Sequence, residues 1–219
     1  LFGIMTGREI VLPATKPVKG LNFAILKTVA MENVVDLPKK AFQNSIEKLK
    51  KAGANISEIS VSSVGEAMDL TGLLYSPEAY ATWKHKIEKS PDLMFAKILE
   101  RFRSGANVLA SDFINAWDKL MDLRKQYHSE VEAYDAVLIP TSPIIPPEVG
   151  RLVDDGDFYN SQNLLALRNT RIGNLMGGCS ISLPTDTHSC GILIMGRPNE
   201  EERLLRLAQA CELVLARNR

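Results

Sequence analysis

The stretch of this sequence with the most evident potential for chemistry is NLMGGCSISLP, residues 174–184, where two glycines precede a cysteine and two serines. Glycines permit a sharp turn and leave backbone N–H groups open to an oxyanion, so a thiol or hydroxyl beside them is a candidate nucleophile. A nucleophile elbow has a small residue directly after the nucleophile, whereas Ser180 and Ser182 are followed by Ile181 and Leu183. The alternation of small and large residues is instead typical of a strand that enters a core.

A nucleophile also needs a general base, and the candidate imidazoles are His85, His128 and His188. His188 follows in the next polar turn and could meet Cys179 or Cys190, but no neighbouring residue is placed to orient it. We favour packed thiols and a solvated turn histidine, with a Cys/His site as the alternative. His85 and His128 fall in charged helical stretches and are interpreted as surface residues.

Motifs for phosphate, dinucleotide and zinc-protease chemistry are absent: the sequence has no GxxxxGK[ST], no GxGxxG after a strand and no HExxH. The acidic stretch VDDGDFYN, residues 153–160, lacks the spacing and terminal glutamate of a calcium loop and is interpreted as a solvated turn. We therefore predict no metal site and no cofactor.

Composition excludes further classes of partner. The 219 residues include 26 Lys and Arg against 26 Asp and Glu, so no net field favours nucleic acid or an anionic membrane. No apolar run approaches the roughly 20 residues of a membrane span. Cys179, Cys190 and Cys211 have neither metal-type nor disulfide-framework spacing, which predicts reduced thiols and a cytoplasmic protein.

The elements that position these residues follow from hydrophobic periodicity. The runs LNFAILKT, residues 21–28, and ANISEISV, residues 54–61, predict buried strands. Between them a helix is expected from Asp36, as N-cap, to Gly53, with Pro38 in its first turn and an apolar face of Phe42, Ile46 and Leu49. A strand, a helix and a strand in about 40 residues predict a parallel βαβ crossover.

The remaining chain is predicted to be helical over residues 65–134 and then to alternate between strands and helices. The clearest helix, around residues 111–135, has an apolar face of Phe113, Trp117, Leu120, Tyr127, Val131 and Tyr134. A buried strand is expected to stop at Pro140, because proline cannot donate into a central ladder. A loop over 147–162 and a helix up to about 176 should follow. Two short strands, CSISL and CGILIMG, precede a closing helix with Asn199 as N-cap and Glu202 close to a capping box. The expected fold class is α/β, with a mixed, largely parallel sheet flanked by helices.

Three segments also carry motifs whose order is informative: YDAVLIPTSPIIPP (134–147), NTRIGNLMGGCSISLP (169–184) and GILIMGRPNEEERLLRLAQACE (191–212). The first resembles the strand and Pro-Thr-x-Pro loop of amidase signature enzymes. The second resembles that family's Thr-x3-Asn-Leu pattern, which turns into a strand. The third resembles the family's final strand and closing helix. Upstream, LFGIMTGRE is similar to the segment that leaves that family's catalytic core, and GLNFAILKT to the next strand. The resemblance covers essentially the whole chain.

The resemblance implies part of an α/β/α sandwich whose catalytic groups lie elsewhere. In this family a serine nucleophile, a second serine on a cis peptide and a lysine all belong to the N-terminal half. No position here matches them, because there is no GGSSGG-like run and Lys16 and Lys19 lie in a linker. We expect residues 1–219 to be the C-terminal region of an amidase-signature domain, with 1–20 a linker from the catalytic core and no catalytic residue in this chain.

Arg101, Thr170 and Asn174 are the substrate-binding residues that the resemblance implies. Family members that act on charged substrates use an arginine before a glycine ahead of the long helix; Arg101 in RFRSG matches that place, with Arg103 as the alternative. A surface helix charge is the competing interpretation of Arg101. Thr170 and Asn174 match the Thr-x3-Asn pattern, and their competing role is to cap and brace the turn before Cys179.

The position of Leu167 bears on the choice of substrate. Glutamine-using relatives carry an acidic residue ahead of the Thr-x3-Asn pattern, and it would fall at about Leu167. The resemblance therefore disfavours a glutamine amidotransferase.

The implied function is cleavage of a carbon–nitrogen bond in a small-molecule amide by serine acyl transfer in the complete protein, while this chain alone is inactive. The alternative is a stand-alone, non-catalytic α/β binding module that lacks the catalytic serines and lysine. A fragment would leave an unpaired sheet edge and an exposed apolar face, which predicts self-association, whereas a stable monomer would favour the module.

Overall fold

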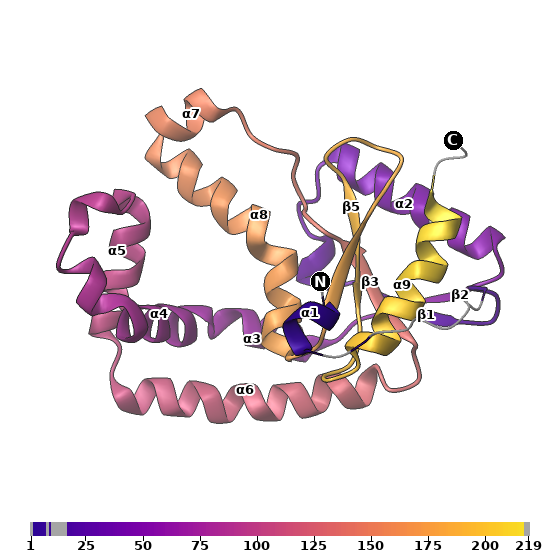
Figure 1. Cartoon of the computed structure of the whole chain (residues 1–219), viewed down its shortest axis with the longest axis horizontal. Coiled ribbons are helices and arrows are strands. Elements are labelled where there is room, and N and C mark those ends of the chain that lie inside the picture. The colour runs from indigo at the N-terminus through magenta and orange to yellow at the C-terminus, as the bar shows by residue number, and fades with distance from the viewer. Residues whose placement is uncertain (1, 8, 10–16, 217–219) are drawn as a thin grey trace. The chain divides into compact units, whose positions relative to one another are not determined.

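A five-stranded mixed sheet is the centre of the fold (Figure 1). Its order is β2-β1-β3-β5-β4, and its strands are β1 (Asn22–Leu26), β2 (Asn55–Ile59), β3 (Ala136–Pro140), β4 (Ser180–Pro184) and β5 (Gly191–Met195). β1 pairs in parallel with β2 and β3, whereas β5 is antiparallel to β3 and β4. The predicted α/β class, with strands near the expected positions and one parallel βαβ unit, is confirmed.

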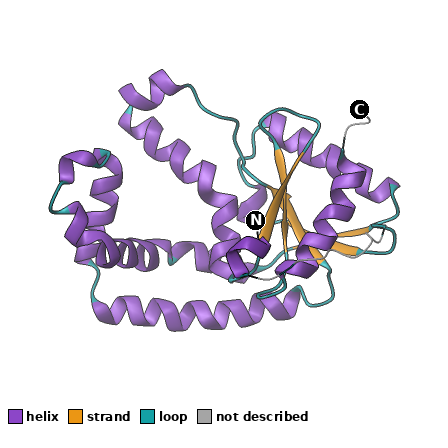
Figure 2. Ribbon diagram, in the orientation of Figure 1, coloured by secondary structure: helices purple, strands orange, loops and turns teal. Residues whose placement is uncertain are grey.

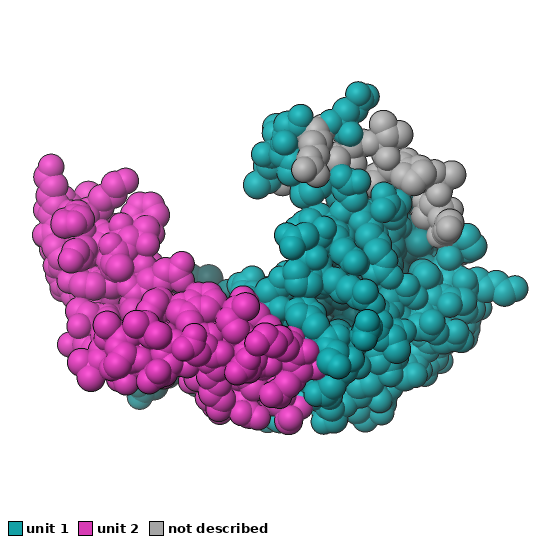
Figure 3. Space-filling model, turned by 90° about the horizontal axis from the view of Figure 1, so that it is seen from below, with its two compact units in different colours: residues 1–61, 128–219 teal, residues 62–127 magenta. Residues whose placement is uncertain are grey.

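The computed structural model describes residues 2–7, 9 and 17–216, which divide into two units (Figure 3). Unit 1 takes its described residues from 1–61 and 128–219 and contains the sheet, and unit 2 is 62–127. The expected linker over 1–20 lies partly outside the described residues; within it, Phe2–Thr6 form the short helix α1.

Helices account for most of the remaining described residues (Figure 2). Unit 1 contains η1 (Val29–Met31), α2 (Asp36–Lys51), α7 (Val149–Asp154), α8 (Gly156–Met176) and α9 (Glu201–Leu215). Unit 2 contains α3 (Ser62–Asp69), α4 (Thr71–Ile87), η2 (Pro91–Leu93), α5 (Ala96–Ser104) and η3 (Gly105–Asn107). The long helix α6 (Ala110–Glu130) begins in unit 2 and ends in unit 1.

Helices cover both faces of the sheet in unit 1. On one face α2 and α9 pack over the strands in a cluster that includes Phe23, Leu138, Ile194, Phe42, Leu49 and Cys211. On the other face α8 lies directly against β4 and β5, because a Cβ on Gly173 would be 2.7 Å from Ser180 Oγ and 3.8 Å from Met195 Sδ. Double-sided burial explains why β1, β3 and β5 are nearly continuous apolar runs.

The predicted N-caps of two helices are wrong. Val35 is the N-cap of α2, so Asp36 is its first helical residue, where a carboxylate still interacts favourably with the helix dipole. Asn199 has φ +61, a left-handed conformation, and α9 begins after Glu200. Asparagine tolerates that conformation better than most residues, which makes it a turn former here rather than a cap.

The predicted loop over residues 147–162 is also wrong, because α7 and the first two turns of α8 occupy most of it. Asp155 is the N-cap of α8, and its carboxylate accepts a 2.9 Å hydrogen bond from the Phe158 N–H. The same acidic, glycine-containing composition that is typical of a solvated loop thus provides a helix start.

Two buried polar side chains of α8 fix that helix to the ends of two parallel strands. Asn169 Nδ2 donates to the carbonyl oxygens of Ala30, in η1 after β1, at 3.1 Å and of Pro140, at the end of β3, at 2.7 Å. Arg168 donates to the same Ala30 oxygen and to Asn169 Oδ1, both at 3.1 Å. Burial lowers the pKa of Arg168, and the charge of Glu32 partly opposes that shift.

We predict that Asn169→Ala lowers the free energy of unfolding by about 1–3 kcal/mol, because it leaves a buried carbonyl without its donor. Urea denaturation measures the change. Asn160→Ala, the same substitution at an exposed position of α8, is the control and should have little effect. Equal effects of the two variants would show that the Asn169 contacts contribute nothing specific.

Candidate functional site

Cys179 has the surroundings of a packed thiol rather than a nucleophile. It directly precedes β4, and its Sγ–H donates to the Arg197 carbonyl oxygen at 3.1 Å. Burial raises the pKa of the Cys179 thiol, and the nearby Glu201 carboxylate raises it further. Since the thiolate is the nucleophilic form, both effects oppose cysteine catalysis at neutral pH.

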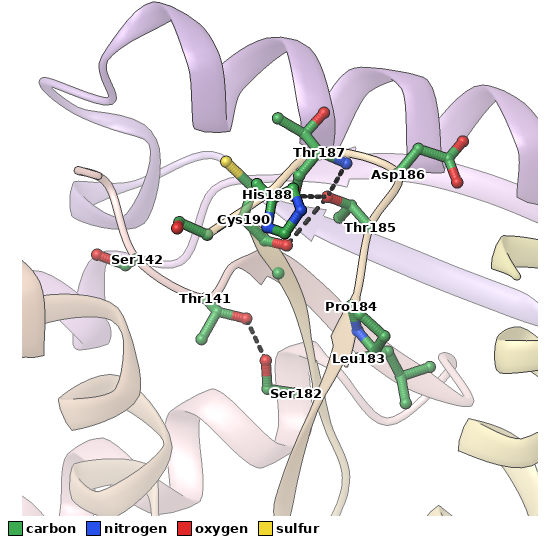
Figure 4. Close-up of a pocket in the computed structure, with 12 residues that line it drawn as sticks. Thr141, Ser142, Ser182, Leu183, Pro184, Thr185, Asp186, Thr187, His188 and Cys190 are labelled. Carbon is green, nitrogen blue, oxygen red and sulfur yellow. Dashed lines mark hydrogen bonds between the residues drawn. The ribbon is translucent and has the colours of Figure 1, made fainter. Parts of the chain in front are cut away.

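The other two cysteines are buried more completely than Cys179, and burial raises the pKa of Cys190 and brings that of Cys211 to about 12. His188 is exposed in the turn beside Cys190 (Figure 4), but among the described residues no hydrogen bond joins its ring to a thiol. The geometry therefore favours packed thiols over a Cys/His site.

The two helical histidines differ. His85 is exposed on α4, as predicted. His128 is half-buried, and its Nε2–H donates to the Met176 carbonyl oxygen at 2.9 Å, a structural contact that its interpretation as a surface residue did not predict. The bond joins the end of α6 to the last turn of α8, where helix carbonyls lack intrahelical partners.

A pocket of about 550 Å³ lies at the carboxyl ends of β3 and β4 and the start of β5 (Figure 4). We call it the hairpin pocket; it is lined by residues 141, 142 and 182–191. The hydroxyl oxygens of Thr141, directly after β3, and Ser182, in β4, lie 2.7 Å apart in it. Sequence reasoning missed this pair, because the residues are 41 positions apart and no motif links them.

The loop of the hairpin pocket is held by its own hydrogen bonds. Thr185 Oγ1 accepts from the Thr187 N–H at 3.2 Å and lies 3.0 Å from the Cys190 carbonyl oxygen. Asp186 forms an ion pair with Lys48 of α2. These contacts give the polar turn between β4 and β5 a defined conformation.

The residues that the resemblance implies for substrate binding fall in both units. Thr170 and Asn174 are one turn apart on α8, so their side chains share a face, and Thr170 Oγ1 donates to the Leu167 carbonyl oxygen at 3.1 Å. Arg101 lies on α5 in unit 2. The convergence of the three on one pocket stays a prediction.

Arg103 has a structural partner. Its Nε and Nη2 donate to the two carboxylate oxygens of Glu88 at 2.9 and 2.6 Å, which lowers the pKa of Glu88 and raises that of Arg103. The glycine of RFRSG also has a packing role, because a Cβ on Gly105 would lie 2.1 Å from the Ser76 carbonyl oxygen of α4. The choice of Arg101 over Arg103 for substrate contact stays a prediction.

Two further classes of feature are absent from the part of the chain that the structure describes. Within residues 2–7, 9 and 17–216, no three His, Cys, Asp or Glu side chains are grouped so that they could hold a metal ion. Over the same ranges, no helix is long and apolar enough to cross a membrane.

Comparison with known proteins gives one consistent family. The family model described as Amidase matches residues 6–205. The chain is 27% identical to 2-amino-5-chloromuconic acid deaminase of Comamonas testosteroni, over 93% of this chain and 46% of that protein. It is also 27% identical to a glutamyl-tRNA(Gln) amidotransferase subunit of Staphylococcus aureus, over 90% and 45%. The chain thus spans about half the length of the curated relatives that it matches.

Solved structures share the fold at lower identity. Kluyveromyces lactis allophanate hydrolase superposes with a TM-score of 0.79 at 19% identity, over 96% of this chain and 35% of that one. A structure described as an amidase gives 0.76 at 20% identity, over 98% and 49%. The corresponding glutamyl-tRNA(Gln) amidotransferase protein from Thermotoga maritima gives 0.69 at 18%, over 89% and 42%.

We predict that all three thiols of the folded chain react more slowly with a disulfide reagent at neutral pH than those of the urea-unfolded chain, because folding raises their pKa values. The half-buried Cys179 should react first. Stopped-flow absorbance measures the rates, and Cys179→Ala assigns the first phase. A thiol that reacts faster than it does in the unfolded chain would restore the Cys/His alternative.

Proposed function

Because the chain belongs to the amidase family, we propose that it is part of a hydrolase that cleaves a carbon–nitrogen amide bond by serine acyl transfer. The observation that carries the proposal is the family match over residues 6–205. The matched segment corresponds to less than half of the curated relatives and offers no activated thiol. The proposal therefore places the reacting groups in a part of the complete protein outside these 219 residues, and it assigns only pocket residues to this chain.

The proposed reaction proceeds in two steps. A lysine kept neutral by burial takes a proton through a bridging serine from the nucleophilic serine, which attacks the amide carbonyl carbon. The C–N bond breaks, the amine leaves with a proton, and water hydrolyses the acyl-enzyme. None of these three catalytic groups is assigned to a residue of this chain.

In this proposal the chain supplies substrate contacts. Thr170 and Asn174 present a hydroxyl and an amide from one face of α8, and Arg101 presents a cation for an acidic substrate. One relative is named as a deaminase of an acid, which agrees with a cationic contact. By the resemblance, the acidic residue of glutamine-using relatives would fall at about Leu167, so we disfavour glutamine as the substrate although an amidotransferase component is among the relatives.

A non-catalytic binding module remains the second candidate, because the described cysteines are packed and none is paired with a histidine. The two candidates differ in the mass of the native protein. A native mass of roughly twice the 24.2 kDa of this chain would support the hydrolase, since the chain spans 46% of a relative. A native mass of 24.2 kDa would support the module.

We predict that the purified 219-residue chain releases no ammonia from a panel of small amides, while the protein isolated from its native source does. A coupled ammonia assay measures both. Hydrolysis by the chain alone that disappears in Cys179→Ala or Ser180→Ala would contradict the proposal, because the nucleophile would then lie in this chain.

We predict that Arg101→Ala in the active protein raises KM for amides that carry a carboxylate and changes KM for neutral amides little, because it removes the cation that the proposal assigns to the substrate carboxylate. Arg103→Ala is the matched control, since that side chain pairs with Glu88. It should leave the ratio of the two KM values unchanged. If the ratio of the two KM values shifts in Arg103→Ala and not in Arg101→Ala, then Arg103 and not Arg101 contacts the substrate carboxylate.

A further inference from the structure

The hairpin pocket contains a pair of hydroxyls that no protein group saturates. Thr141 Oγ1 and Ser182 Oγ are 2.7 Å apart, and either can donate to the other. A hydroxyl has one donor and two acceptor sites, so a bonded pair retains one O–H and several lone pairs. Side by side, the pair therefore offers one donor and one acceptor to a ligand.

Gly191 makes room for this pair at the start of β5. A Cβ on Gly191 would lie 2.7 Å from Thr141 Oγ1 and 2.8 Å from Ser182 Oγ. Its backbone is ordinary β-strand without a positive φ, so the conformation does not demand glycine. The requirement is spatial, because any larger residue would displace the two hydroxyls.

The charged groups of the hairpin pocket are compensated within the fold. The carboxylate of its lining, Asp186, is ion-paired with Lys48, and Lys48 also donates to the Leu215 carbonyl oxygen at 3.4 Å. No lysine or arginine lies among the lining residues. The lining therefore offers no lysine or arginine to an anionic group, and the hydroxyl pair is a neutral recognition element.

The backbone around the pair is fixed on both sides. The Thr141 N–H donates to the Gly191 carbonyl oxygen at 2.9 Å, and Asn169 holds the carbonyl of the preceding Pro140 at 2.7 Å. Ser182 lies within β4, paired with Leu193 of β5. The spacing of the hydroxyls is therefore set before any ligand arrives, which lowers the entropic cost of binding.

From this geometry we infer that the hairpin pocket binds the primary amide group of a small molecule, with the Thr141–Ser182 hydroxyl pair as its recognition element. A primary amide carries an acceptor oxygen and a donor nitrogen on one carbon, so it accepts the remaining O–H and donates to a hydroxyl lone pair. An ionised carboxylate only accepts and an ammonium only donates, so neither matches both hydroxyls. The inference rests on the proposed function and extends it to residues that the resemblance does not nominate.

Titration of the isotope-labelled 219-residue chain with acetamide, followed by backbone amide NMR, tests the inference. Acetate is the isosteric control probe. Acetamide should shift the signals of Thr141, Ser182 and Gly191, whereas acetate should not. Comparable shifts with acetate, or no shift with acetamide up to the highest concentration at which the chain stays folded, overturn the inference.

Variants separate recognition from structure. Ser182→Ala and Thr141→Val should each weaken acetamide binding about tenfold, as expected for one hydrogen bond, while Thr141→Ser keeps the hydroxyl and the affinity. Ser180→Ala changes the next serine on the same face of β4, outside the pocket, and should bind like the unchanged chain. Unchanged affinity in both Ser182→Ala and Thr141→Val overturns the inference.

Failure of the inference is distinguishable from failure of the proposed function, because the titration needs no turnover. Ammonia release by the native protein without acetamide binding at the hairpin pocket would overturn only the inference. Acetamide binding at the pocket, without hydrolysis by the native protein, would overturn only the proposed function.

Discussion

The hydrogen bonds of Asn169 are the interaction on which the rest of unit 1 depends. One side-chain amide bonds to the carbonyls of Ala30 and Pro140, which follow or end two adjacent parallel strands. Carbonyls at the ends of parallel strands leave the sheet without partners, and burying them unpaired is costly. α8 satisfies both from its own polar residue and is thereby fixed to the end of the sheet.

The same contact occupies one of the places at the sheet where a ligand could bind. Open α/β sheets bind ligands outside the carboxyl ends of their strands, near the point where the strand order reverses. In this sheet β1 connects to β2 on one side and has β3 on the other, and Asn169 with Arg168 fills the space between the ends of β1 and β3. The hairpin pocket lies next to this point, beyond the end of β3, where Thr141 and Ser182 meet beside Gly191.

The proposed division of labour, with pocket residues in this chain and the reacting groups in the complete protein, has a physical basis. Acyl transfer requires a nucleophile whose deprotonated form is accessible at neutral pH, and burial opposes that form at all three thiols of this chain. Substrate recognition requires only neutral donors, acceptors and one fixed charge. Strand ends and the exposed face of a helix can supply those groups.

Periodicity and local motifs by themselves determined much of this protein. Alternating and helical patterns located the five strands of the described residues and the α2 face of Phe42, Ile46 and Leu49. The order of local motifs indicated the family to which the chain belongs, and all of these signals reside in neighbouring residues. Local reasoning failed where composition was ambiguous, as at Asp155, which caps a helix within an apparent acidic loop. Only the tertiary structure decided that Asn169 bridges two strand ends, that Arg103 pairs with Glu88, and that Thr141 meets Ser182. Each of these contacts joins residues at least 15 positions apart, and sequence spacing carries no information about such a meeting until the strands and helices have packed.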